Sequence, residues 1–265
     1  MSNRIENKFK QLKTQKKKAF ITYITAGDPN LKTTEALVLA FAKTGVDVIE
    51  LGVPFSDPMA DGKTIQAGSQ RALKSGTTLS KILKLVERLR RRTEIPIVLM
   101  TYYNPVFHYG EAAFIKDARK AGVDGLIFPD LPPEEAIPLR HLARAAGISL
   151  IFLLAPTTVK ERVKTIAQAS AGFIYYVSLT GVTGERKSLS EDLFQNVRTA
   201  KRLTNKPICV GFGISTPAQA KSVAKVADGI IVGSAIVKQI ENNLKNRQLI
   251  KNVTRFAQKL AKAVK

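Results

Sequence analysis

The stretch VIELGVPFSDPMADG, residues 48–62, places one carboxylate inside an apolar run and two more in the segment that follows. The predicted strand at residues 46–51 is apolar and β-branched from Val48 onward, as in a buried strand, and Glu50 interrupts that character. A buried carboxylate without a partner costs several kcal/mol or keeps its proton. Glu50 therefore faces a functional site or is held ready to donate a proton, with a structural salt bridge as the alternative.

On both sides of this stretch, short β-branched runs alternate with amphipathic helical patterns, as expected for repeated βα units and a parallel sheet. The predicted strands are residues 19–25, 46–51, 96–101, 125–128, 149–154, 172–177, 207–210 and 229–232. The predicted helices are residues 5–12, 33–44, 79–89, 112–121, 134–146, 159–167, 193–203, 217–226 and 250–263. Eight such units favour an α/β fold, a single (β/α)8 TIM barrel formed by residues 1–265 as one domain. The first helix is expected to cover the bottom of the barrel.

Composition argues against several classes of protein. Cys209 is the only cysteine and lies in an apolar run, so a buried structural thiol is expected and no disulfide can form within the chain. His108 and His141 are the only histidines, which leaves little material for a metal site or a serine-type triad. No signal-peptide core and no apolar run of membrane-spanning length occurs. The sequence thus predicts a soluble, cytoplasmic protein without a bound metal.

The chain carries 42 Lys and Arg against 21 Asp and Glu, a net charge of +21, which raises the question of nucleic acid. The basic residues are spread over several helical segments, however, and are expected to point to water. They include Lys81, Lys84, Arg88, Lys160, Arg162, Lys164, Arg198, Lys201, Arg202, Lys251, Arg255 and Lys259. Specific nucleic-acid binding is therefore not expected, although the positive field would attract an anionic substrate.

Functional groups of a parallel barrel gather at the carboxyl ends of its strands. Glu50, on the second strand, and Asp61, in the loop after it, are predicted to form a proton-handling pair. Closure of that loop over a substrate would bring the two carboxylates together. Asp57 lies in Ser56-Asp57-Pro58, a good turn sequence, so a structural or partner-contacting role is favoured for it.

The last three strands are followed by glycine-bearing segments at 180–184, 211–215 and 233–234. Glycine lets backbone N–H groups approach phosphate oxygens, and a helix beginning at Ser234 would add its dipole. Neither GxxxxGK[ST] nor GxGxxG occurs in the sequence, which favours a small phosphorylated metabolite over a nucleotide. No predicted strand ends in lysine, so direct acid–base cleavage is favoured over a Schiff-base mechanism.

These motifs resemble those of the tryptophan synthase α-subunit family over nearly the whole chain. The resemblance rests on ELGVPFSDPMADG at 50–62, TAGDP at 25–29, GVTG at 181–184, GFGIS at 211–215 and GSAIV at 233–237. It implies a (β/α)8 barrel that cleaves indole-3-glycerol phosphate, a small phosphorylated indole substrate, to indole and glyceraldehyde 3-phosphate. This is a carbon–carbon lyase reaction of tryptophan biosynthesis.

The resemblance also implies a role for each candidate residue. Glu50 would protonate the indole carbon and accept the glycerol hydroxyl proton, while Asp61 would hold the indole N–H. The phosphate would be bound by Gly184, Gly213, Gly233 and Ser234, and Thr183 would hydrogen-bond Asp61 as its loop closes. The apolar walls around the indole would be Tyr23, Ile65, Tyr175 and Phe212. Asp57 would lie near a partner interface.

The implied partner is a pyridoxal-phosphate β subunit, in an α2β2 heterotetramer that condenses the indole with serine. The resemblance implies no cofactor in the present chain. An alternative is a weakly active barrel kept mainly as an allosteric activator of that partner. The intact carboxylate pair and the glycine loops argue against this alternative.

Overall fold

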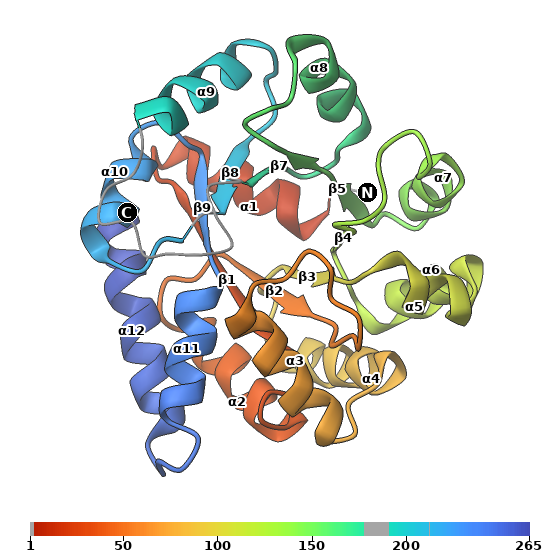
Figure 1. Ribbon diagram of the computed structural model, residues 1–265, viewed down its shortest axis with the longest axis vertical. Helices are drawn as coiled ribbons and strands as arrows, with labels where there is room; N and C mark the ends of the chain where they lie inside the picture. The colour runs from red at the N-terminus through yellow and green to blue at the C-terminus, as the bar shows by residue number, and fades with distance from the viewer. Residues whose placement is uncertain (1–2, 178–190, 212) are drawn as a thin grey trace.

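The computed structural model describes residues 3–177, 191–211 and 213–265. Within them, nine parallel strands form one sheet, which lies at the centre of the molecule with the helices around it (Figure 1). The strands are β1 (Ala19–Thr25), β2 (Val48–Gly52), β3 (Ile97–Met100), β4 (Gly125–Ile127), β5 (Ser149–Ile151), β6 (Leu153–Leu154), β7 (Ile174–Val177), β8 (Ile208–Gly211) and β9 (Gly229–Val232). Each lies within one residue of a predicted strand range, so the predicted parallel barrel is confirmed.

The nine strands correspond to eight barrel positions because β5 and β6 are two parts of one predicted strand. The sheet order is β5-β4-β3-β2-β1-β9-β8-β7-β6, so the chain crosses from one end of the sheet to the other at Phe152. The Phe152 N–H donates to the Ser170 hydroxyl at 3.4 Å, while its carbonyl accepts from Tyr175 N–H at 3.1 Å. This local departure from the ladder closes the barrel.

The described helices include every predicted one, with ends shifted by up to three residues. They are α1 (Arg4–Thr14), α2 (Leu31–Phe41), α3 (Lys63–Lys74), α4 (Leu79–Arg90), α5 (Tyr103–Tyr109), α6 (Glu111–Ala121), α7 (Ile137–Ala145), α8 (Lys160–Ala169), α9 (Glu191–Arg202), α10 (Pro217–Ala224), α11 (Ser234–Asn242) and α12 (Leu249–Val264). Three of them lie outside the predicted helix ranges: α3 and α5, which follow β2 and β3, and α11, which begins at Ser234, where a helix start is expected. Helix α3 follows the loop that carries Asp61, and α5 follows Tyr102 at the end of β3.

Helix α1 covers the bottom of the barrel, as predicted. Its apolar residues Ile5, Phe9 and Leu12 are buried in one cluster with inward-facing strand residues such as Val48 and Cys209. The side chain of Asn3 caps the helix by accepting from Ile5 N–H, and its amide donates to the carbonyls that precede β4 and β5. The amino-terminal end of the barrel is therefore closed by packing, and Cys209 is buried as expected.

A second, larger core lies between the sheet and the surrounding helices. The basic residues singled out from the sequence lie mostly on the outer sides of these helices, where Lys84, Lys164 and Arg198 are exposed. None of the helices in the described ranges is long and apolar enough to cross a membrane.

Candidate active site

Glu50 lies at the centre of β2 and points into the barrel. Strand alternation puts it on the same face as Val48, which belongs to the interior cluster. The residue is only 1% exposed, and neither carboxylate oxygen has a hydrogen-bond partner among the described residues. Burial, followed by the nearby charge of Asp61, raises the pKa of Glu50 to about 8. The geometry therefore excludes the salt-bridge alternative within the described residues and leaves a carboxyl that holds its proton at neutral pH.

Asp61 lies two residues before α3, in the loop that follows β2. The side-chain amide of Gln66 donates to the Asp61 carbonyl at 2.8 Å, which fixes the backbone at this point. Burial raises the pKa of Asp61 to about 6, and hydrogen bonding from the Tyr102 hydroxyl opposes that rise. Near neutral pH, Asp61 is thus mainly ionised while Glu50 is mainly protonated.

Two tyrosines lie beside the carboxyls. Tyr23 on β1 pairs directly with Glu50 across the parallel ladder and is 8% exposed. Its neighbours Ile65 and Val237 form a small buried cluster with it, against which Met100 packs. Burial raises the pKa of Tyr175 on β7, and the charges of Glu50 and Tyr23 add to that effect. The predicted wall residues Tyr23, Ile65 and Tyr175 are therefore gathered around the upper end of the barrel interior.

Glycine makes the positions of both tyrosines possible. A Cβ atom added at Gly52 would lie 2.1 Å from the Tyr23 hydroxyl oxygen, and one added at Gly211 would lie 2.5 Å from the Tyr175 ring. Contacts this short would force the rings to move. These two strand-end glycines therefore set the orientation of the tyrosines, a role that their place in the sequence does not reveal.

The described phosphate-site candidates lie after β8 and β9. Gly233 is the N-cap of α11 and Ser234 is its first residue, so the amino end of this helix is available to an anion. A Cβ at Gly233 would lie 3.4 Å from Tyr23 Cβ, so this helix start adjoins the tyrosine wall. Gly213 has φ +28°, a backbone conformation that L side chains rarely adopt, and a Cβ added there would meet no heavy atom within 4 Å.

Some predicted residues are not placed with this group. Thr183, Gly184 and Phe212 lie outside the described residues. Asp57 is exposed and hydrogen-bonded to the neighbouring Ser56 hydroxyl, as its turn sequence predicts.

Tyr102 belongs to the site, although no sequence motif assigns it a role. Its hydroxyl accepts from Ala60 N–H at 2.8 Å, and its ring lies 5.2 Å from that of Phe55. Tyr102 thus links the end of β3 to the loop that bears Asp61. Its position directly after a predicted strand was the only sequence signal for this role.

An ion pair buried behind the site also could not be predicted. The guanidinium of Arg71 on α3 donates to both carboxylate oxygens of Asp28, at 2.7 and 2.8 Å, and lies 3.3 Å from Glu241 on α11. Arg71 therefore joins the helix after Asp61 to the helix that starts at Ser234.

A protonated carboxyl, an ionised one and a helix start open to an anion all lie at the carboxyl end of a parallel barrel. No group of His, Cys, Asp and Glu residues suited to a metal ion occurs in the part of the chain that the structure describes. These features define an enzyme that moves protons on a small phosphorylated substrate.

Comparisons with known proteins identify the family. A model of the tryptophan synthase alpha chain family matches residues 9–265. The alpha chain of Geotalea daltonii is 56% identical over 238 residues, covering 90% of each chain, and that of Citrifermentans bemidjiense is 52% identical over 262 residues, covering 99% of this chain and 98% of the relative. The crystal structure of the alpha subunit from Legionella pneumophila superposes with a TM-score of 0.93 at 38% identity, covering 100% of this chain and 99% of that one. The chain belongs to the tryptophan synthase alpha chain family.

Proposed function

We propose that Glu50 and Asp61 carry out the proton transfers by which this chain cleaves indole-3-glycerol phosphate to indole and glyceraldehyde 3-phosphate. The chain is a carbon–carbon lyase of tryptophan biosynthesis by its family membership. The observation that carries the proposal is the burial of Glu50 with a pKa of about 8 and no hydrogen-bond partner among the described residues.

Glu50 acts twice in the proposed mechanism. Its carboxyl first donates a proton to the indole carbon that bears the glycerol chain. The resulting carboxylate then accepts the proton of the adjacent glycerol hydroxyl, whose oxygen forms the aldehyde carbonyl. The electron pair of the broken carbon–carbon bond returns to the indole ring. Each transfer of this kind typically contributes about 10² to 10⁴-fold, and atoms and charge balance without a redox partner.

Asp61 stabilises the charge that this sequence creates. Protonation of the ring carbon places positive charge on the ring nitrogen, and an ionised carboxylate that accepts the N–H bond lowers the energy of that intermediate. A pKa of about 6 keeps Asp61 ionised at neutral pH, whereas Glu50 retains its proton. Different burial thus gives two neighbouring carboxyls opposite protonation states.

The remaining candidates bind and enclose the substrate in this proposal. The phosphate is held at the start of α11 by Gly233 and Ser234, with Gly213 and Gly184 beside it. Thr183 fixes Asp61 when its loop closes. The indole ring lies between apolar walls, formed by Tyr23, Ile65, Tyr175 and Phe212. No cofactor is needed for a cleavage that moves only protons, so we propose that this chain acts without one.

The proposed partner is a pyridoxal-phosphate β subunit that consumes the indole in a cytoplasmic α2β2 complex. Asp57, Met59 and Phe107, which we call the rim patch, support such a docking surface. Met59 is 91% and Phe107 68% exposed, an unusual exposure for large apolar side chains. Tyr102 links the two segments, since it hydrogen-bonds Ala60 and is followed by α5, which carries Phe107. Docking at this patch would therefore alter the position or mobility of the loop that carries Asp61.

The test is an indole-release assay with purified protein and indole-3-glycerol phosphate, alone and after mixing with a β subunit. Release of indole by the isolated chain, increased by the partner, supports the proposal. A chain that releases no indole alone or in the complex, yet stimulates the β reaction, would support the activator alternative. In the proposed complex, Phe107→Ala lowers the stimulation and leaves the activity of the isolated chain within about twofold.

A further inference from the structure

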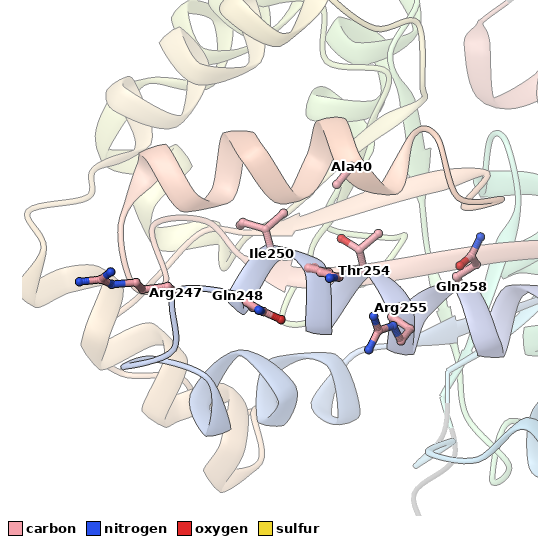
Figure 2. A pocket seen from close by; sticks show the side chains of 8 residues that line it. Ala40, Arg247, Gln248, Ile250, Thr254, Arg255 and Gln258 are labelled. Carbon is pink, nitrogen blue, oxygen red and sulfur yellow. The ribbon is translucent and has the colours of Figure 1, made fainter.

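A solvent-open hollow of about 620 Å³ lies on the outside of the barrel, between α2 and α12. Ala40 of α2 borders one side, and residues from Arg247 to Gln258 border the other. Figure 2 shows Ile250 and Thr254 directed from α12 toward the helix that carries Ala40. None of the candidate active-site residues lines this hollow, so it is separate from the site described above.

Three cations gather at the hollow. Lys251 and Arg255 lie one turn apart on α12, about 6 Å along the helix, and Arg247 lies in the turn just before it. Within the described residues, none of the three forms an ion pair or a hydrogen bond through its side chain. Other cations of the outer layer are paired, for example Arg162 with Glu134.

The lining of the hollow contains no carboxylate to balance these charges. It does contain neutral polar groups, including the side chains of Gln248 and Thr254. The Thr254 hydroxyl oxygen is buried and has no hydrogen-bond partner among the described residues. A buried hydroxyl normally finds a partner, so a ligand that displaces the side chains around this oxygen would gain a hydrogen bond to it.

We propose that this hollow binds a small organic anion that carries phosphate groups. Arg247, Lys251 and Arg255 hold its negative oxygens, because Arg and Lys form charge-assisted hydrogen bonds to phosphate. The Thr254 hydroxyl and the Gln248 amide contact its neutral part. The volume lies within the roughly 300 to 1,000 Å³ of small-molecule sites. A polynucleotide is disfavoured because the three cations adjoin a hollow that also offers neutral polar groups, Gln248 and Thr254, instead of forming a basic surface alone.

Binding there would connect helices that support the catalytic end of the barrel. Helix α12 packs against α2, α11 and β1, and these last two elements carry Ser234 and Tyr23. A ligand that bridges α12 and α2 would restrict the relative movement of these elements. The site therefore offers a place where a phosphorylated metabolite stabilises the barrel without competing with the substrate.

The test uses inorganic pyrophosphate as the probe and the full-length chain at about 0.15 M salt, where exposed charges are screened beyond roughly 8 Å. Backbone amide shifts are followed by NMR, because pyrophosphate also has access to the helix start at Ser234. The proposal predicts saturable shifts at residues 247–258, with an affinity that differs from the one reported by the amides of Gly233 and Ser234.

Two triple variants make the test specific. Arg247→Gln/Lys251→Gln/Arg255→Gln removes three charges from the hollow and is expected to weaken the α12 response by about tenfold or more. Arg144→Gln/Arg198→Gln/Lys221→Gln removes the same charge from exposed positions on α7, α9 and α10 and leaves the response within about twofold. Thr254→Val, nearly the same size, weakens it by a smaller factor than the triple change at the hollow.

If both triple variants weaken the α12 response equally, the response reflects the overall positive charge of the protein, and the proposal is overturned. Shifts confined to Gly233 and Ser234 would also overturn it. The proposal would also be overturned if a single-stranded oligonucleotide produced saturable shifts of the α12 amides and pyrophosphate did not.

Discussion

Tyr23 on β1 and Glu50 on β2 are direct partners in the parallel ladder, with both side chains on the inner face of the barrel. Both residues are almost fully buried, Glu50 at 1% and Tyr23 at 8% exposed, so the tyrosine belongs to the wall beside the carboxyl. Burial is the largest cause of the raised pKa of Glu50, so the wall beside it has a chemical effect as well as a packing one. The same ring depends in turn on Gly52, where a side chain would overlap its hydroxyl.

Tyr23→Ala is expected to admit water to Glu50 and to lower its pKa from about 8 toward its ordinary value of 4.5. The alkaline limb of the kcat/KM profile should then move to lower pH. Tyr23→Phe keeps the ring and is expected to leave that limb within about half a unit. Equal pH profiles for the two variants would show that the ring does not keep Glu50 dry.

The wild-type profile itself is expected to be bell-shaped. Activity requires ionised Asp61 and protonated Glu50, so kcat/KM should rise around pH 6 and fall around pH 8. In the residual activity of the variants, Glu50→Gln should flatten the alkaline limb and Asp61→Asn should flatten the acid limb. A profile with no alkaline limb between pH 7 and 9 would contradict the protonation state assigned to Glu50.

Stability should depend on pH through the same group. The folded state keeps the Glu50 proton up to about pH 8, whereas the unfolded chain loses it near pH 4.5. The free energy of unfolding is therefore highest below pH 4.5, as far as Glu50 determines it, and decreases as the pH rises from 4.5 to 8. Glu50→Gln removes this loss and should raise the free energy of unfolding at pH 8.5 by on the order of 4 kcal/mol relative to wild type. Denaturant unfolding at pH 5 and pH 8.5 measures the difference. Glu135→Gln, at an exposed position, serves as the control and should show no such gain.

Tyr102→Phe tests the connection between β3 and the Asp61 loop. The hydroxyl lowers the pKa of Asp61, so its removal should raise that pKa above about 6 by up to about one unit and shift the acid limb of activity upward. Tyr103→Phe is a matched control, because that hydroxyl donates to Glu111 at 2.9 Å instead. An acid limb that moves equally in both variants would remove Tyr102 from the site.

Arg71→Ala should be strongly destabilising. It leaves the Asp28 carboxylate, whose side chain is 0% exposed, without its bidentate partner. Breaking one member of a buried pair costs about 3 to 5 kcal/mol, measurable by denaturant unfolding. Asp28→Asn/Arg71→Ala should recover part of that loss, since no charge is left buried. A double variant whose loss equals the sum of the two single losses would show that the two residues are not coupled.

The sequence predicts the barrel because its strands are short apolar runs that stand out from the polar helices between them. Helix α3 was not predicted, since its buried residues include Gly68, Ser69 and Ala72, and small or polar residues give no apolar stripe. Helix α2 begins earlier than predicted because Asn30 accepts from Thr33 N–H and caps it. The local residue pattern is thus sufficient to predict the strands, but it predicts less reliably those helices whose buried face consists of small residues.

The candidate site follows the same division. Glu50 stands out because it lies between the apolar residues of β2, and Asp61 because it follows in the adjoining loop. The contribution of Tyr102, the room that Gly52 leaves for Tyr23 and the Arg71 ion pair all depend on segments that meet only after folding. Residue type and spacing cannot reveal such contacts.

The central claim is that Glu50 is the proton donor and acceptor of the cleavage. Its most direct test is single-turnover cleavage of indole-3-glycerol phosphate by Glu50→Gln in the complex with the β subunit. Substrate affinity is measured in parallel. The expected result is a loss of about 10² to 10⁴-fold in the cleavage rate, because glutamine can neither donate nor accept the proton, with substrate affinity within a few fold of wild type. Cleavage at a rate near that of wild type would contradict the account.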